Sequence, residues 1–211
     1  MIPWLLALAA TLAGDVTHQR TVALGKATVR LIQVLRPDSS CSARLEFRRP
    51  GKPRRILWSG NAEAVGLVAG LFIPDRQPSA GYLTVVKAGD YEGLLLFVEP
   101  DGSLTTLPGG WFWIDEPHRL LFAISASDDP ETVVVDLRTL RRVGEDIAIT
   151  PEYFYRDGNR VFLTGQGLDG ERAFEFDFTR RRFVRTQSAR TRWTRIPWDF
   201  DLNHQPECGS R

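Results

Sequence analysis

The chain has 211 residues, and its 27 Lys and Arg nearly balance its 26 Asp and Glu. With 43% hydrophobic and 25% charged residues, the composition is that of a globular protein and excludes an intrinsically disordered chain. The near-neutral charge argues against a dedicated nucleic-acid-binding protein, because such a protein must neutralise many phosphates. No run of eighteen apolar residues is present, so the sequence predicts no transmembrane helix.

The chain begins with an apolar segment typical of a signal peptide. Residues 2–12 form a hydrophobic run, and Thr11 and Ala13 place small side chains before an expected cleavage site. The alternative is a strand or helix that stays in the mature core. The first interpretation predicts a signal peptide over residues 1–14, a single domain over residues 15–200 and a C-terminal tail over residues 201–211. The protein is then periplasmic or secreted.

The chain has two cysteines, Cys41 and Cys208, and neither lies in a zinc-binding spacing. In an exported protein an even pair of cysteines often forms a disulfide, which here would join the domain to its tail. The alternative is two unrelated thiols. We therefore expect a Cys41–Cys208 disulfide if the protein is exported.

After residue 26 the chain consists of short runs rich in β-branched and aromatic residues, and helix signals are nearly absent. Turns such as PDG (100–102) and DGN (157–159) are typical of hairpins, because Gly and Asn accept a positive φ. The runs divide into four units. Second strands are expected at 29–34, 83–86, 120–124 and 161–164, third strands at 44–47, 94–98, 133–136 and 173–177, and fourth strands at 54–58, 103–107, 140–143 and 182–186.

The last two units align without gaps at a shift of 41 residues. Apolar positions coincide in each strand, for example Phe112 with Tyr153 and Leu121 with Phe162, although few residues are identical. Four antiparallel four-stranded units are what a β-propeller requires. The first unit lacks a first strand in this alignment. We expect residues 192–200 to supply it and so to close the ring.

The stretch VVVDLRTLRR (133–142), echoed by AFEFDFTRRR (173–182), resembles the outer hairpin of YVTN- and PQQ-type propeller blades. In those families a strand ends in Asp and turns through Thr into the edge strand. Asp136 and Thr139 keep that spacing, whereas Thr179 lies only two residues after Asp177. The resemblance implies an all-β, small β-propeller-like fold of about four four-stranded antiparallel blades, and nothing specific about a ligand. The alternatives are an incomplete propeller-like meander and a β-sandwich.

Motifs of familiar enzyme classes are missing from the sequence. It has no GxSxG, HExxH or Walker motif. Of its three histidines (His18, His118 and His204), only His118 lies within a repeat, in a turn that hairpin chemistry explains. If the protein is an enzyme, Asp115, His118 and Asp199 are the first residues to test.

One acidic pair is a candidate for a metal. Asp128 and Asp129 could offer oxygen ligands to Ca²⁺, but no Asp/Asn–Gly loop accompanies them, and a loop between strands explains them as well. The sequence therefore predicts no catalytic set, no metal and no cofactor.

Aromatic and basic residues are the better candidates for binding. Trp111 and Trp113 share one face of an expected strand, and large side chains of this kind either fill the space between blades or stack on a ligand. Arginines crowd residues 48–55 and 180–195, where they either form a positive docking surface or protect sheet edges from aggregation. The binding candidates are Trp111, Trp113, Arg181, Arg182 and Trp198.

These observations predict a non-catalytic, exported bacterial protein that binds another protein or an envelope polymer. By analogy with small periplasmic β proteins, it would be an inhibitor or immunity-type protein acting on an envelope-targeted enzyme. The alternatives are a lyase or hydrolase with its site at the propeller mouth, and a structural module that a partner completes. The sequence leaves the oligomeric state open.

Overall fold

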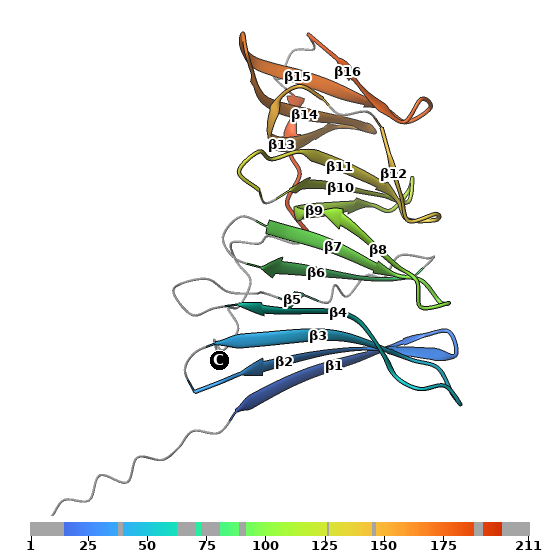
Figure 1. Ribbon diagram of the computed structural model, residues 1–211. Helices are drawn as coiled ribbons and strands as arrows, with labels where there is room; N and C mark the ends of the chain where they lie inside the picture. Colours follow the sequence, from blue (N-terminus) through green and yellow to red (C-terminus); the bar gives the residue numbers. More distant parts are fainter. Residues whose placement is uncertain are drawn as a thin grey trace, which may run out of the picture.

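A computed structural model describes residues 15–37, 40–62, 71–72, 81–88, 92–125, 127–144, 147–187 and 192–199. The described chain is all-β, and its strands form four antiparallel sheets that follow one another along a stack (Figure 1). The predicted signal peptide (1–14) and tail (201–211) lie outside the described residues, and both stay predictions.

Each sheet is a meander of consecutive strands. The first sheet contains β1 (Val16–Leu24), β2 (Ala27–Leu35), β3 (Cys41–Arg48) and β4 (Arg55–Ala62). The second contains β5 (Leu71–Phe72), β6 (Tyr82–Ala88), β7 (Glu92–Val98) and β8 (Leu104–Pro108). The third contains β9 (Gly110–Asp115), β10 (Leu120–Ser125), β11 (Thr132–Asp136) and β12 (Arg141–Val143). The fourth contains β13 (Thr150–Asp157), β14 (Arg160–Gly167), β15 (Gly170–Asp177) and β16 (Arg182–Arg185), and β17 (Thr194–Arg195) joins it beside β13.

The predicted units are confirmed, since the second, third and fourth strands of every sheet overlap the expected ranges. The 41-residue repeat also holds in the strand register. Phe112 pairs with Ala123 in the third sheet, and 41 residues later Tyr153 pairs with Thr164 in the fourth. The alternation of apolar residues and the turn residues together specify these pairings, because a slip of one residue would turn every buried side chain to the other face.

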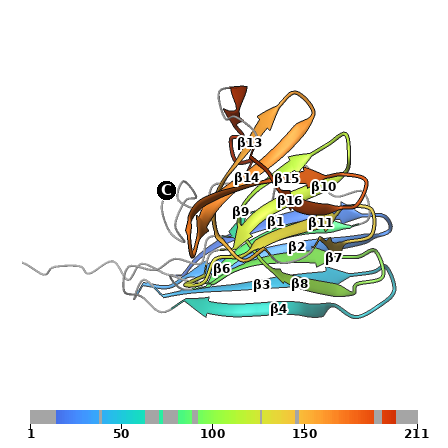
Figure 2. The same cartoon turned by 90° about the horizontal axis from the view of Figure 1, so that it is seen from above.

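The predicted closing strand is wrong. Residues 194–195 form β17 on the fourth sheet, and β1 is the first strand of the first sheet. Gly25, with φ +61°, permits a tight turn through which β1 pairs with the adjacent β2. This local pairing closes a far shorter loop than pairing with residues 192–200 would. The first and last sheets lie at opposite ends of the stack, so the fold is the open, propeller-like meander (Figure 1). Figure 2, which looks down the stack, shows the strands of the fourth sheet turned relative to those of the first.

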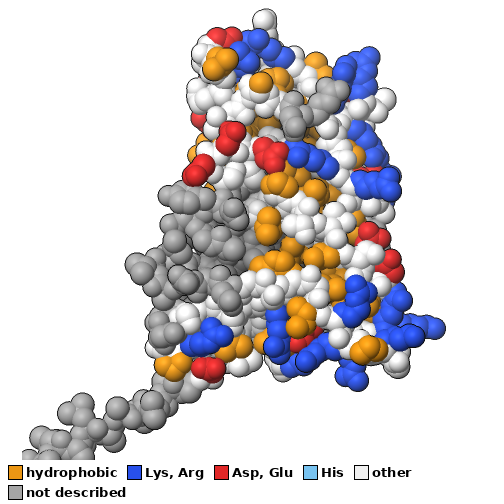
Figure 3. Space-filling model, viewed as in Figure 1, with side chains coloured by type: hydrophobic (Ala, Val, Ile, Leu, Met, Phe, Trp, Pro, Cys, Tyr) orange, Lys and Arg blue, Asp and Glu red, His pale blue; other side chains and the backbone are white. Residues whose placement is uncertain are grey.

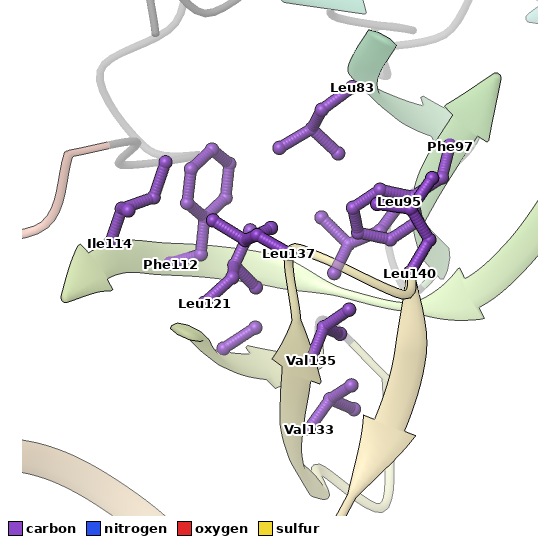
Figure 4. Close-up of a cluster of buried hydrophobic side chains, with 11 residues drawn as sticks. Leu83, Leu95, Phe97, Phe112, Ile114, Leu121, Val133, Val135, Leu137 and Leu140 are labelled. Atoms are coloured by element: carbon purple, nitrogen blue, oxygen red, sulfur yellow. The ribbon is translucent and has the colours of Figure 1, made fainter. Parts of the chain in front are cut away.

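Hydrophobic side chains fill the space between successive sheets. The described residues form three clusters, one for each pair of neighbouring sheets. Figure 4 shows the middle one, in which Leu95 and Phe97 of the second sheet meet Phe112 and Leu121 of the third, all four with 0% exposure. Each such side chain contributes roughly 1.5–3 kcal/mol of burial free energy. The stack is therefore held face to face, as a repeat protein is by its interfaces.

The outer hairpins of the last two sheets share a turn built on an aspartate. Asp136 Oδ1 accepts a hydrogen bond from Arg138 N at 2.9 Å, and Asp177 Oδ1 accepts one from Thr179 N at 2.9 Å. Leu140 and Arg181, which are 41 residues apart, both take a left-handed conformation with φ +54°. The Asp side chain stabilises the turn by occupying its backbone donors, which gives the Asp of this pattern a structural reason.

Candidate functional site

The segment of residues 192–199, here called the strap, runs from the fourth sheet back to the third (Figure 1). Ile196 N donates to Phe154 O at 2.9 Å in β13, and Ile114 N of β9 donates to Asp199 Oδ2 at 2.7 Å. The strap therefore joins two sheets along the side formed by their first strands.

A cavity of about 450 Å³ lies between the strap and the last two sheets. This volume falls in the usual range of small-ligand sites, about 300–1,000 Å³. Three arginines and two aspartates contribute to its wall, so the lining carries an excess of positive charge. The lining residues are Trp113, Ile114, Arg156, Asp157, Gly158, Arg192, Thr194, Arg195, Ile196, Pro197 and Asp199.

One of the three candidate tryptophans reaches this cavity. Trp113 is 3% exposed, stacks on Phe122 with ring centroids 4.7 Å apart, and lies 5.4 Å below the Arg156 guanidinium. Its Nε1 is buried and has no hydrogen-bond partner among the described residues. Trp198 packs edge-on against Phe154 at 5.9 Å, and Trp111 is half-buried between the sheets, so packing accounts for both.

The three residues of the enzyme alternative meet at this junction. Asp115 is 3% exposed; its Oδ1 accepts a bond from Arg156 Nη2 at 2.7 Å, and its Oδ2 lies 2.5 Å from His118 Nδ1. The His118 ring stacks on Phe178 of the fourth sheet at 3.8 Å. Both carboxylate oxygens of Asp115 thus hold groups that connect the two sheets, and Asp199 binds a backbone N–H. The contacts of Asp115 with Arg156 and His118 connect the third and fourth sheets and are here called the clasp.

Sequence reasoning missed Arg156 as a partner of Asp115, although the repeat contains a signal for it. The two residues occupy equivalent positions, 41 residues apart, in consecutive sheets. Opposite charges at equivalent positions of stacked units can pair directly across the interface, and here they do.

A second buried carboxylate binds the predicted Arg181. Asp136 is 2% exposed and accepts bonds from Arg138 Nε at 3.1 Å and Arg181 Nη1 at 2.6 Å. Burial alone would raise the pKa of Asp136, but the hydrogen bonds from these two arginines outweigh it and lower the pKa from 3.8 to about 2. Arg181 therefore ties the fourth sheet to the third, whereas Arg182 is exposed.

The lowered pKa of Asp136 predicts a stability that depends on pH. Because the folded pKa lies below the unfolded value, the ionised form contributes about 2 kcal/mol above pH 5, which is lost as the pH falls toward 2. We expect Asp136→Asn to be less stable at pH 7 by about this amount, with the difference shrinking between pH 4 and 2. Urea unfolding of both proteins across this range measures it, and a difference independent of pH would contradict the assignment.

The remaining acidic candidates show no metal site. Asp128 and Asp129 are exposed in the loop before β11, and no group of three metal-ligating side chains occurs in the part of the chain that the structure describes. His204 and Cys208 lie outside that part. Within the same described ranges, no helix has the length and apolar character needed to cross a membrane.

The fold and the site define an open stack of antiparallel meanders with a cationic cavity under a C-terminal strap. A scan against protein-family models finds none that matches the chain, and a search of curated proteins also finds no match.

Proposed function

We propose that this is a non-catalytic binding protein whose strap cavity receives an anionic group of a partner protein. The cationic lining of that cavity supports the proposal most directly. Arg192 and Arg195 are exposed at the strap, where guanidinium groups can bind a carboxylate by two parallel hydrogen bonds. A cation–π contact, 3.7 Å from the Tyr153 ring centroid, positions Arg195. Trp113 adds an aromatic wall.

The acidic residues beside the cavity already accept hydrogen bonds from other groups of the protein, which favours binding over catalysis. A general base needs an oxygen or nitrogen directed at a substrate proton. Asp115 instead holds Arg156 and His118, and Asp199 holds the backbone of β9. We therefore place the hydrolase or lyase alternative second. Substrate turnover that His118→Ala abolishes without unfolding the protein would reverse this order.

The signal-like start of the chain supports a periplasmic or secreted location for this function. An acidic surface of an envelope-targeted enzyme is a suitable partner, and the protein would then act as its inhibitor or immunity-type protein. The blade-like hairpins support a relation to the YVTN- and PQQ-type propeller repeats. Both steps extend the proposal by analogy.

A comparison of two variants with equal changes in charge tests the cavity. We expect Arg192→Glu/Arg195→Glu to lose at least tenfold in affinity for the captured partner, because both substitutions place negative charge at the cavity. Arg141→Glu/Arg185→Glu changes the net charge equally at exposed positions away from the cavity, and it should bind like the wild type. Calorimetry with the partner captured from envelope extract is the measurement. Unchanged affinity of the first variant would contradict the proposal.

The alternative of a module that a partner completes has one observation in its favour. On the fourth sheet Tyr153 and Val184 are 37% and 42% exposed, although both are large and apolar. Light scattering of the isolated protein separates the two functions, because a sheet that pairs with a second copy gives a concentration-dependent dimer. If the protein stays monomeric at all concentrations, binding at the strap cavity is favoured over the module that a second copy completes.

A further inference from the structure

The outward face of the first sheet carries a second cationic hollow, at the other end of the stack from the strap cavity. Strand register places Thr21, Arg30 and Glu46 side by side across β1, β2 and β3, and Arg48 beside Thr28 in the next row. The hollow has a volume of about 640 Å³. Its lining residues are Gln19, Thr21, Thr28, Arg30, Glu46, Arg48, Lys52, Pro53 and Arg54.

The charges of this hollow do not balance. Four cations and one carboxylate line it. That carboxylate, Glu46, is 2% exposed and already has two cations, Arg44 Nε at 2.8 Å and Arg54 Nη1 at 3.2 Å. Glu46 therefore offsets the charge of Arg54 within the lining, and three lining cations remain: Arg30, Arg48 and Lys52. Figure 3 shows Lys and Arg side chains gathered at this lower end of the molecule, where the first sheet lies.

Protection of sheet edges does not explain these cations. Charged residues protect a sheet when they lie on its edge strands. The edges of the first sheet are β1 and β4, whereas Arg30 and Arg48 lie on the central strands β2 and β3. A terminal face of a stack needs a polar surface, which threonine and glutamine would provide without mutual repulsion. Like charges gathered around one hollow repel each other unless a ligand offsets them.

We infer that this hollow binds a compact ligand of the phosphate class that carries at least two negative charges. Arg30, Arg48 and Lys52 supply the charge, and the Thr21 and Thr28 hydroxyls supply further hydrogen-bond donors around it. A tetrahedral oxyanion has acceptors in several directions and suits donors that come from three strands and a hairpin, whereas a carboxylate is planar and singly charged. The group is either part of a free phosphate compound or part of a lipid headgroup.

The inference does not depend on the proposed function of the strap cavity, and its test is separate. The probes are pyrophosphate, titrated by calorimetry, and phosphatidylcholine vesicles with and without phosphatidic acid, assayed by sedimentation at 0.15 M salt. The variants are Arg48→Glu/Lys52→Glu and the control Arg141→Glu/Arg185→Glu, which changes the net charge equally on the third and fourth sheets, away from the hollow. Circular dichroism checks that both variants are folded.

We expect the wild type and the control to bind at least one probe, and Arg48→Glu/Lys52→Glu to bind it at least tenfold more weakly. Binding of pyrophosphate supports a free phosphate compound as the source, and binding only of phosphatidic acid vesicles supports a lipid headgroup. No binding of either probe by the wild type overturns the inference. Equal losses in the two variants also overturn it, because they would reflect net charge alone.

Discussion

Replacing Asp115 by alanine is expected to lower the free energy of unfolding by about 1.5–3 kcal/mol, because it removes charge-assisted hydrogen bonds of a carboxylate that is 3% exposed, whereas its partner Arg156 is 44% exposed and stays solvated. The substitution removes the 2.7 Å bond to Arg156 and leaves that guanidinium beside the buried Trp113 ring without its carboxylate. It also removes the partner of His118, which stacks on the fourth sheet. The third and fourth sheets would thus lose the contacts of Asp115 with Arg156 and His118, which connect them.

A double-mutant cycle separates the free energy contributed by the Asp115–Arg156 ion pair from the effect of simply losing side-chain volume. Arg156→Ala alone should be destabilising, and the double variant should be less destabilised than the sum of the single ones. Asp128→Ala is the matched control, because Asp128 is exposed in a loop and its loss should change stability by less than about 0.5 kcal/mol. Urea unfolding gives all four values. Additive effects of Asp115→Ala and Arg156→Ala would show that the ion pair contributes nothing.

The strands that the sequence predicted well are those in which an apolar run is bounded by turn residues at both ends. In β10 and β14 the apolar run lies between turn residues, and the 41-residue repeat gives independent support. β1 was missed because its signal is weaker. Thr17, Gln19 and Thr21 are exposed on this strand, which lies in a terminal sheet. A strand with one solvated face, next to an apolar N-terminal segment, is easily assigned to that segment.

The open arrangement of the sheets could not be predicted from the same patterns. The hairpin signals specify which strands pair, but ring closure depends on the rotation between successive sheets, and that rotation follows from the shapes of the packed side chains. The same distinction, between pairing that the sequence reveals and packing that it does not, applies to the candidate site. Asp115 and Arg156 are visible as equivalent positions of a repeat, whereas their contact and the cavity beside Trp113 depend on how two sheets pack.

Breaking the predicted Cys41–Cys208 disulfide is expected to destabilise the protein by about 3–5 kcal/mol. In the chain-entropy model a crosslink that closes a loop of more than 100 residues contributes up to about 5 kcal/mol, and native disulfides typically contribute 2–5. Cys41 is 3% exposed at the start of β3, and the strap ends at Asp199 against β9, two sheets away. Sheets pack about 10 Å apart, and the nine residues from 200 to 208 can span about 30 Å when extended. The chain is therefore long enough for the bond.

Such a bond would clamp an open stack, because it joins the first sheet to a strap that is held by the third and fourth. We expect Cys41→Ser, Cys208→Ser and the double variant to unfold at the same urea concentration, since each removes the same crosslink. The wild type in reductant should join them. Mass spectrometry after alkylation should add two labels only to the reduced wild type. Labelling of both cysteines without reductant, or equal stability of the oxidised and reduced wild type, would show that the sheets are held by packing and the strap alone.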